Sequence, residues 1–171
     1  MLLYLVLFPL VLLLLLGTFF IVKQQTAAVI ERFGKFTSVR QSGLHIKIPV
    51  IDRVSGRVSL KVQQLDVVVE TKTKDDVFVK LKVSVQFKVI KDKVYDAFYK
   101  LDFPQEQMNA YVFDVVRAEV PKMILDDVFE KKDDIAIAVK GELNEAMKNY
   151  GFDIIKTLVT DIDPDAQVKE S

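Results

Sequence analysis

The longest hydrophobic run of the chain lies at its amino end. Residues 2–22 read LLYLVLFPLVLLLLLGTFFIV and contain no charged side chain. A helix rises ~1.5 Å per residue, so about twenty residues cross the ~30 Å hydrocarbon core of a bilayer. The run therefore predicts one N-terminal transmembrane helix. The side chains expected to anchor it are Leu2, Leu12, Leu16, Phe19, Phe20 and Val22.

A cleaved signal peptide is the alternative interpretation of this run. No Lys or Arg precedes it, and it is longer than the ~7–15 apolar residues of a typical signal peptide, so an uncleaved anchor is favoured. Only the α-amino group precedes the run as a positive charge. Four cationic residues follow it, namely Lys23, Arg32, Lys35 and Arg40. The positive-inside rule then predicts a single-pass membrane protein with its domain on the cytoplasmic side.

Beyond the anchor, alternation of apolar and polar residues predicts strands. In the stretch GLHIKIP, Leu44, Ile46 and Ile48 alternate with His45 and Lys47. This pattern is typical of a half-buried strand with the three aliphatic side chains facing the core. The same pattern places His45 on the solvent side, so we expect no catalytic or metal-binding role for it.

The phase of the alternation changes once. Apolar residues fall on even positions from Val58 to Val62 and on odd positions from Leu65 to Val69. A shift of one residue turns the side chains of a strand to its opposite face. We therefore predict either a β-bulge or a bend at Gln63-Gln64.

The strongest pattern of the chain is a run of seven apolar residues at period two, from Val77 to Val89. It predicts a strand with one buried face and one solvated face. The solvated face carries a row of basic residues, namely Lys80, Lys82 and Lys88. Such a row usually serves to keep a sheet soluble. The alternative interpretation is that these lysines form a surface that binds lipid headgroups.

After Lys91 the spacing becomes helical. It predicts a short helix from Val94 to Leu101, a second helix that begins at Pro104, and a break at Pro121. A further helix is expected from Asp133 or Asp134, as its N-cap, to a stop near Gly151. The stretch FDIIKTLVTDI then returns to strand character, and Asp163-Pro164 is a helix-start signal. This order predicts an α+β fold, with helices packed on one side of a curved, mainly antiparallel sheet.

The composition excludes several kinds of chemistry. The chain has 171 residues with 24 basic and 24 acidic side chains, so it lacks the basic excess of a nucleic-acid-binding protein. It contains no cysteine and one histidine, and we find no phosphate loop or hydrolase motif. The acidic pairs lie at turns and helix starts, where carboxylates cap backbone N–H groups. We expect neither an enzyme nor a cofactor, and no nucleic-acid partner.

Three stretches carry a resemblance to a known family: AVIERFGKFTSVRQSGLHIKIPVIDRV, SLKVQQLDVVVETKTKDDVFVKLKVSVQFKV, and the segment from DAFYKL and AYVFDV to NYGFDIIKTLVTDIDPD. They resemble the stomatin/prohibitin/flotillin (SPFH, band 7) superfamily. Within it, they are similar to the hypersensitive-induced reaction proteins and to stomatin-like members. The resemblance implies an anchor at 1–23, a band 7 domain at 24–163 and the start of a truncated coiled-coil helix at 164–171.

The resemblance also implies a function. A band 7 protein is expected to be a membrane-anchored scaffold that oligomerises into rings or cages, organises membrane microdomains, and regulates partners such as membrane proteases or channels. Phe33, Phe36 and Ile48 are expected close to the bilayer, either dipping into lipid or packed in the core. The alternative is a lipid- or ligand-binding module that uses the basic row without large assembly. No Gly follows Met1, so myristoylation is excluded.

Overall fold

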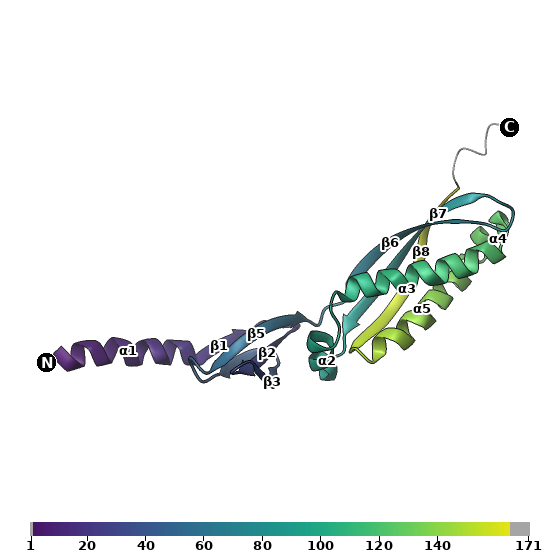
Figure 1. Ribbon diagram of the computed structural model, residues 1–171. Coiled ribbons are helices and arrows are strands. Elements are labelled where there is room, and N and C mark those ends of the chain that lie inside the picture. The colour runs from purple at the N-terminus through teal and green to yellow at the C-terminus, as the bar shows by residue number, and fades with distance from the viewer. Residues whose placement is uncertain (1, 165–171) are drawn as a thin grey trace. The chain divides into compact units, whose positions relative to one another are not determined.

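The computed structural model describes residues 2–164, and the side chains from Tyr4 onward (Figure 1). The chain divides into two compact units, which meet between Lys61 and Val62. We call residues 2–61 the N-terminal unit and residues 62–164 the C-terminal unit. The predicted phase change at Gln63-Gln64 coincides with the start of β6 (Gln63–Lys72), directly after this division. The apolar residues before Lys61 and those from Leu65 onward thus belong to different units, and β6 pairs with its neighbour without a bulge at this point.

The N-terminal unit contains one helix and two small antiparallel sheets. The helix α1 (Leu2–Thr18) leads directly into β1 (Phe19–Val22), which pairs with β4 (Gly43–Ile46). The second sheet has the order β3 (Lys35–Arg40), β2 (Thr26–Arg32), β5 (Asp52–Ser59). The small core of this unit comes from one end of β1 and from β2, and comprises Val22, Ala27, Ala28, Val29 and Ile30.

The predicted helix over residues 2–22 is wrong in its last four residues. The helix ends at Thr18, and Phe19–Val22 form a strand that is in register with β4. Four consecutive β-branched or aromatic residues favour a strand, and pairing with β4 gives their backbone groups hydrogen-bond partners. A count of apolar residues does not detect this pairing. Within residues 2–164, no helix combines the length and the apolar character that are needed to cross a membrane.

The alternation in β4 is confirmed, but the predicted faces are reversed. Leu44 and Ile46 are 66% and 65% exposed, whereas His45 is partly buried. The ring of His45 lies 5.7 Å from that of Phe20, and its Nε2 lies 2.6 Å from the carbonyl oxygen of Gln41. The aliphatic side chains of this strand therefore face outward.

The C-terminal unit is built on one antiparallel sheet with the order β6 (Gln63–Lys72), β7 (Phe78–Val89), β8 (Phe152–Pro164). The strand predicted from the strongest alternation is confirmed as β7, the central strand. Its inward residues are all at most 5% exposed: Val79, Leu81, Val83, Val85, Phe87 and Val89.

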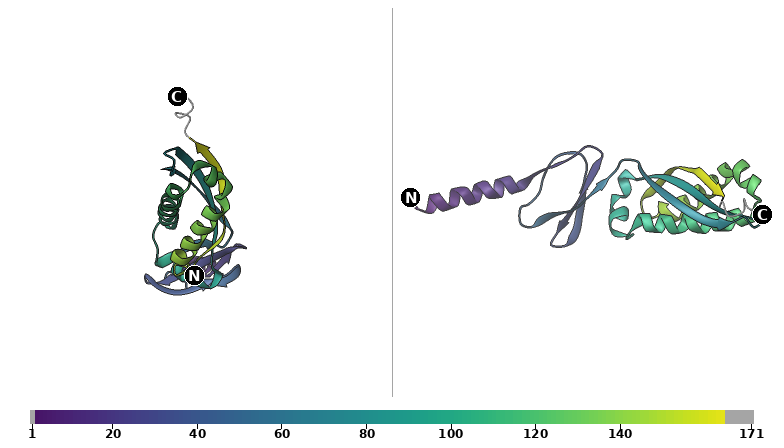
Figure 2. Two further views of the ribbon diagram at one scale, coloured as in Figure 1. Left: turned by 90° about the vertical axis from the view of Figure 1, so that its right-hand side faces the viewer. Right: turned by 90° about the horizontal axis from the view of Figure 1, so that it is seen from above.

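The helical segments of this unit are η1 (Lys91–Lys93), α2 (Val94–Tyr99), α3 (Pro104–Glu119), η2 (Val120–Lys122), α4 (Leu125–Glu130) and α5 (Lys132–Lys148). The two long helices, α3 and α5, cover one face of the sheet. Figures 1 and 2 show α3 and α5 on the same side of the sheet, where α3 contacts β6 and α5 contacts β8. The predicted α+β fold, with a helix that begins at Pro104 and a break at Pro121, is confirmed.

Two predicted helix starts differ from the structure. The N-cap of α5 is Lys131, so Asp133 and Asp134 lie inside the first turn rather than capping it. Negative side chains in that turn still suit the positive end of the helix dipole. At the carboxyl end, Asp163 and Pro164 close β8 and pair with Lys80 and Val79, so the predicted helix does not begin there. The remainder of the predicted coiled-coil start, residues 165–171, lies outside the described residues.

Candidate functional site

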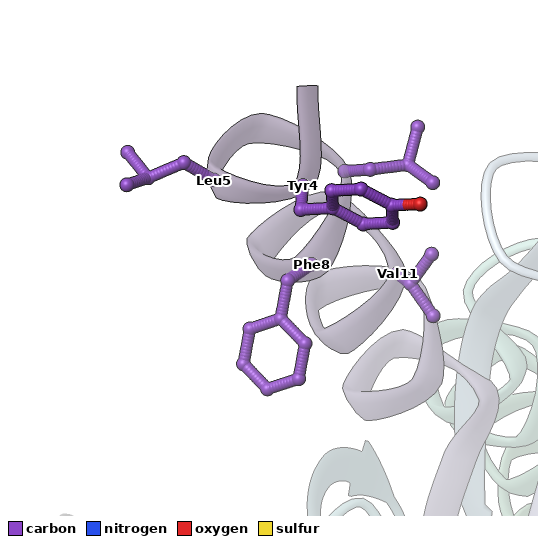
Figure 3. Close-up of a pocket in the computed structure, with 5 residues that line it drawn as sticks. Tyr4, Leu5, Phe8 and Val11 are labelled. Carbon is purple, nitrogen blue, oxygen red and sulfur yellow. The ribbon is translucent and has the colours of Figure 1, made fainter. Parts of the chain in front are cut away.

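The helix α1 exposes apolar side chains around its whole circumference. Tyr4, Leu5, Phe8 and Val11 point away from the helix in several directions (Figure 3). The hollow between them is lined by residues of α1 alone, so it is a gap between outward side chains rather than an enclosed cavity. A helix that is apolar all round is normally covered by protein or by lipid.

A loop is attached to the end of this helix. The amide of Lys47 donates a hydrogen bond to the carbonyl of Thr18 at 2.8 Å. A Cβ placed on Gly17 would lie 3.4 Å from the Cβ of Pro49, which is an ordinary van der Waals contact. The loop of residues 47–51 therefore lies beside the carboxyl end of α1.

The β2–β3 turn lies at the same end of the unit. Arg32, the last residue of β2, is in register with Asp52, the first residue of β5. Asp52 directly follows the 47–51 loop, and Phe33-Gly34 directly follows Arg32. The turn and the loop are therefore neighbours at the end of the unit where α1 is attached.

Apolar side chains project from both the turn and the loop. Phe33 is 83% exposed and Val50 is 93% exposed, and both residues have a positive φ, of 50° and 71°. Ile48, also predicted near a bilayer, is exposed in this loop, whereas Phe36 is half-buried in β3. Sequence reasoning missed Val50, because the backbone angle that turns it outward has no signal in the apolar pattern.

The β1–β4 ribbon adds a further apolar surface. Phe19 pairs with Ile46 and Ile21 pairs with Leu44, and all four side chains are more than half exposed. Directly opposed residues on one face of an antiparallel pair are in contact range. Three residues predicted to anchor the chain thus have different surroundings. Phe19 contributes to this surface, Phe20 faces His45, and Val22 is buried in the core of the N-terminal unit. Leu12 and Leu16 are exposed on α1.

An ion pair between a half-exposed arginine and a buried aspartate joins the turn to the loop. The carboxylate of Asp52, which is 8% exposed, accepts hydrogen bonds from Nε and Nη2 of Arg32 at 2.8 and 3.3 Å. Its Oδ2 also accepts from the amide of Ile48 at 2.9 Å. The hydrogen bonds from Arg32 and then from Ile48 lower the pKa of Asp52 below its usual value, against the opposing effect of burial.

The basic row of the C-terminal unit lies among acidic side chains. Lys80 Nζ lies 3.0 Å from a carboxylate oxygen of Glu70, and Lys82 Nζ lies 3.4 Å from one of Asp66. Lys88 is in register with Asp153 on β8. Hydrogen bonds from Ser84 and then from Gln64 lower the pKa of Asp66, which keeps that carboxylate charged. This sheet face therefore presents both signs of charge.

We find little that could carry reaction chemistry in the described part of the chain. Among residues 2–164, no group of three or more His, Cys, Asp and Glu side chains is placed to hold a metal ion. Asp75, from one of the acidic pairs, has a structural role as the sequence suggests. Its Oδ1 accepts from the hydroxyl of Thr73 at 2.6 Å and from the amide of Leu125, in the first turn of α4, at 3.1 Å.

The fold is that of a helix-covered antiparallel sheet preceded by a small β unit and an apolar helix. Residues 20–171 match the model of the SPFH domain / Band 7 family, and the chain belongs to that family. The resemblance drawn from its motifs is thereby confirmed.

Two relatives illustrate the range of similarity. The chain is 44% identical to hypersensitive-induced response protein 4 of Arabidopsis thaliana over 151 residues, which are 88% of this chain and 52% of the relative. It is 29% identical to the mitochondrial stomatin-like protein 2 of Homo sapiens over 151 residues, 88% of this chain and 42% of that protein. The chain thus spans about half the length of the curated relatives that it matches.

Proposed function

We propose that this protein is a membrane-attached scaffold. In this proposal α1 and the apolar end of the N-terminal unit bind a lipid bilayer, and the C-terminal unit is held in the water next to it. The observation that carries the proposal is the exposed apolar surface of α1, which continues into the exposed ribbon and loops at its end. Removing such a surface from water contributes about 25 cal/mol per Å².

The scaffold part of the proposal follows from tethering. Domains that are confined to a membrane surface meet at a high effective concentration, so weak lateral contacts are enough for assembly. We propose rings or cages of identical chains that organise a patch of membrane and regulate proteases or channels within it. Membership of the SPFH / Band 7 family supports this proposal. The four cations that follow residues 2–22 support a cytoplasmic position for the domain.

We propose a scaffold rather than an enzyme because three carboxylates with a lowered pKa each have a structural partner. Asp52 accepts from Arg32, Asp66 accepts from Ser84, and Asp75 accepts from the amide of Leu125 in α4. A lipid-binding module on the Lys80, Lys82 and Lys88 row is the second candidate. The two ion pairs on that row reduce its attraction for an anionic headgroup, and we therefore rank it below the scaffold.

Membrane attachment is tested by flotation of the purified chain with phospholipid vesicles. We expect the chain to float with the vesicles, and the double variant Leu12→Lys/Leu16→Lys to remain largely in the dense fraction. The matched control is Val68→Lys/Ile137→Lys, which places the same charges on exposed aliphatic positions of the C-terminal unit. Flotation of both variants to the same extent would overturn attachment through α1.

Assembly is tested by the native mass of the detergent-extracted protein. We measure it for this chain over a wide concentration range. A large closed assembly supports the scaffold. If the chain stays monomeric at every concentration, the assembly part of the proposal fails, and the lipid-binding module becomes the better account.

A further inference from the structure

We propose that Phe33 and the loop of residues 48–51 form a two-pronged site that is already shaped to insert into the surface of an anionic bilayer, and that Arg32 and Asp52 hold both prongs in position. This inference rests on the proposed function, because α1 must bring the N-terminal unit to the membrane. It goes beyond that function by naming the part that enters the lipid surface and the pair that shapes it.

Both prongs have an unusual backbone conformation. Val50 has φ 71° and Phe33 has φ 50°, a region that residues other than Gly, Asn and Asp seldom adopt. For a β-branched residue such as valine this conformation is a clear outlier. Strained residues persist where the surrounding structure enforces them, and they cluster at ligand contacts and other functional positions. Here the strain places two large apolar side chains almost fully in solvent.

A set of hydrogen bonds enforces this conformation. The amide of Ile48 donates to Oδ2 of Asp52, and the amide of Asp52 donates back to the carbonyl of Ile48, each at 2.9 Å. These two hydrogen bonds close the loop on itself. Arg32 then ties the closed loop to the β2–β3 turn through Asp52 Oδ1 and Oδ2. Both prongs are therefore fixed to one ion pair.

Basic side chains predominate around the prongs. The acidic residues in or next to the turn and the loop are Glu31 and Asp52. Four cationic residues lie there, namely Arg32, Lys35, Lys47 and Arg53. Apolar tips surrounded by cations suit the boundary between acyl chains and anionic headgroups. The attachment of the 47–51 loop to the end of α1 places these cations where that helix would leave the lipid.

The test measures the depth of single labelled sites in vesicles. The chain contains no cysteine, so one introduced cysteine gives one label. We label Val50→Cys and Phe33→Cys with a fluorophore and reconstitute the full chain in vesicles of phosphatidylcholine and phosphatidylserine that contain a shallow spin-labelled lipid as quencher. Leu12→Cys on α1 reports membrane attachment, and Ile137→Cys, on an exposed position of α5, reports background.

We expect quenching at least five-fold stronger at positions 50 and 33 than at position 137. Strong quenching at 12 with background quenching at 50 and 33 would overturn this inference and leave membrane attachment intact. Background quenching at 12 as well would overturn the attachment itself. A label at 50 that is shielded from water but not quenched by the lipid would show that a second copy of the chain covers the prongs, which also contradicts the inference.

The role of the ion pair is tested in the Val50→Cys chain. We expect Arg32→Gln to reduce quenching at position 50 at least two-fold, with no change at position 12 in the parallel Leu12→Cys chain. Lys35→Gln is the matched control, because it removes the same charge from the same end without touching Asp52. An equal reduction of quenching at position 50 in both variants would show that insertion depends on positive charge alone and that the Arg32–Asp52 pair does not position the loop.

A second variant covers the case in which Arg32→Gln does not fold. Asp52→Asn retains the size of the side chain and an oxygen acceptor for the Ile48 amide, but it loses the ion pair with Arg32. We expect the same reduction at position 50, measured after circular dichroism has shown native secondary structure. Unchanged quenching at position 50 in this folded variant would overturn the positioning role.

Discussion

The two units of this protein both contain strands with alternating apolar residues, but the apolar face is buried in one unit and exposed in the other. In the C-terminal unit the apolar side of β7 is buried under helices, and Leu81 and Phe87 are at most 1% exposed. In the N-terminal unit the apolar side of β4 points outward, and the side chains of Leu44 and Ile46 are about two-thirds exposed. Alternation thus identifies a strand and its two faces, but a second layer of structure decides which face is covered. In the N-terminal unit we infer that the covering layer is lipid.

The same substitution, leucine to alanine, should change the free energy of unfolding by very different amounts in the two units. Leu81→Ala should lower the free energy of unfolding of the C-terminal unit by about 2–5 kcal/mol, because it leaves a cavity in a closely packed core. Leu44→Ala should change the stability of the N-terminal unit by less than about 0.5 kcal/mol in detergent, since its side chain is mostly exposed. Urea titration monitored by circular dichroism measures both, and equal effects would remove the contrast.

Alanine substitution should destabilise the protein to different extents at two glycines with positive φ. A Cβ on Gly151 would lie 2.5 Å from the carbonyl oxygen of Lys93, whereas a Cβ on Gly34 would meet no atom within 4 Å. Gly151→Ala should therefore destabilise its unit by about 2–4 kcal/mol, from backbone strain plus displacement of η1. Gly34→Ala should cost about 1–2 kcal/mol from strain alone. The difference in thermal midpoints is the measurement, and a larger loss for Gly34→Ala would contradict the geometry.

A smaller effect is expected from pH. Hydrogen bonding from Thr73 lowers the pKa of Asp75 below its ordinary value of 3.8. A carboxyl whose folded pKa is lowered stabilises the folded state above its unfolded pKa, and this stabilisation is lost as pH falls through the folded pKa. The urea midpoint of the C-terminal unit should therefore fall below about pH 4. Asp75→Asn should show a shallower fall, and an unchanged pH profile in this variant would contradict the assignment.

The smallest expected effect concerns the basic row. The triple variant Lys80→Gln/Lys82→Gln/Lys88→Gln should float with anionic vesicles as well as the unchanged chain does, because acidic neighbours already offset this charge. The matched variant in the N-terminal unit is Lys35→Gln/Lys47→Gln/Arg53→Gln, for which we expect weaker flotation at low salt. Loss of binding in the first variant alone would favour the lipid-binding module.

Much of the C-terminal unit could be predicted from the sequence, because local signals and tertiary packing agree there. The alternation of β7 and the proline at the start of α3 each indicate the element that the structure contains. The N-terminal unit could be predicted less well. The end of α1 depends on the pairing of Phe19–Val22 with a strand more than twenty residues away, and hydropathy alone does not encode that pairing.

The candidate site was predicted in part for the same reason. Their apolar character and their place in the chain predict that Phe33 and Ile48 lie near a bilayer, and both are exposed beside the end of α1. The apolar pattern does not indicate the exposure of Val50, which depends on its positive φ. It does not indicate the Arg32–Asp52 pair either, because that pair depends on a register between β2 and β5 that brings residues twenty positions apart into contact. The clue in the sequence was a lone arginine before Phe33-Gly34 and a lone aspartate after the IPVI segment.

The most direct test of the central claim is a map of lipid contacts on the full chain. The protein is reconstituted in vesicles that contain a phospholipid with a photoactivatable group on its acyl chain, irradiated, and digested, and the lipid adducts are located by mass spectrometry. We predict adducts on residues 4–21 and around Phe33 and Val50, and none above background on β6, β7 or α5. Adducts confined to the C-terminal unit, or equal labelling of both units, would contradict the account.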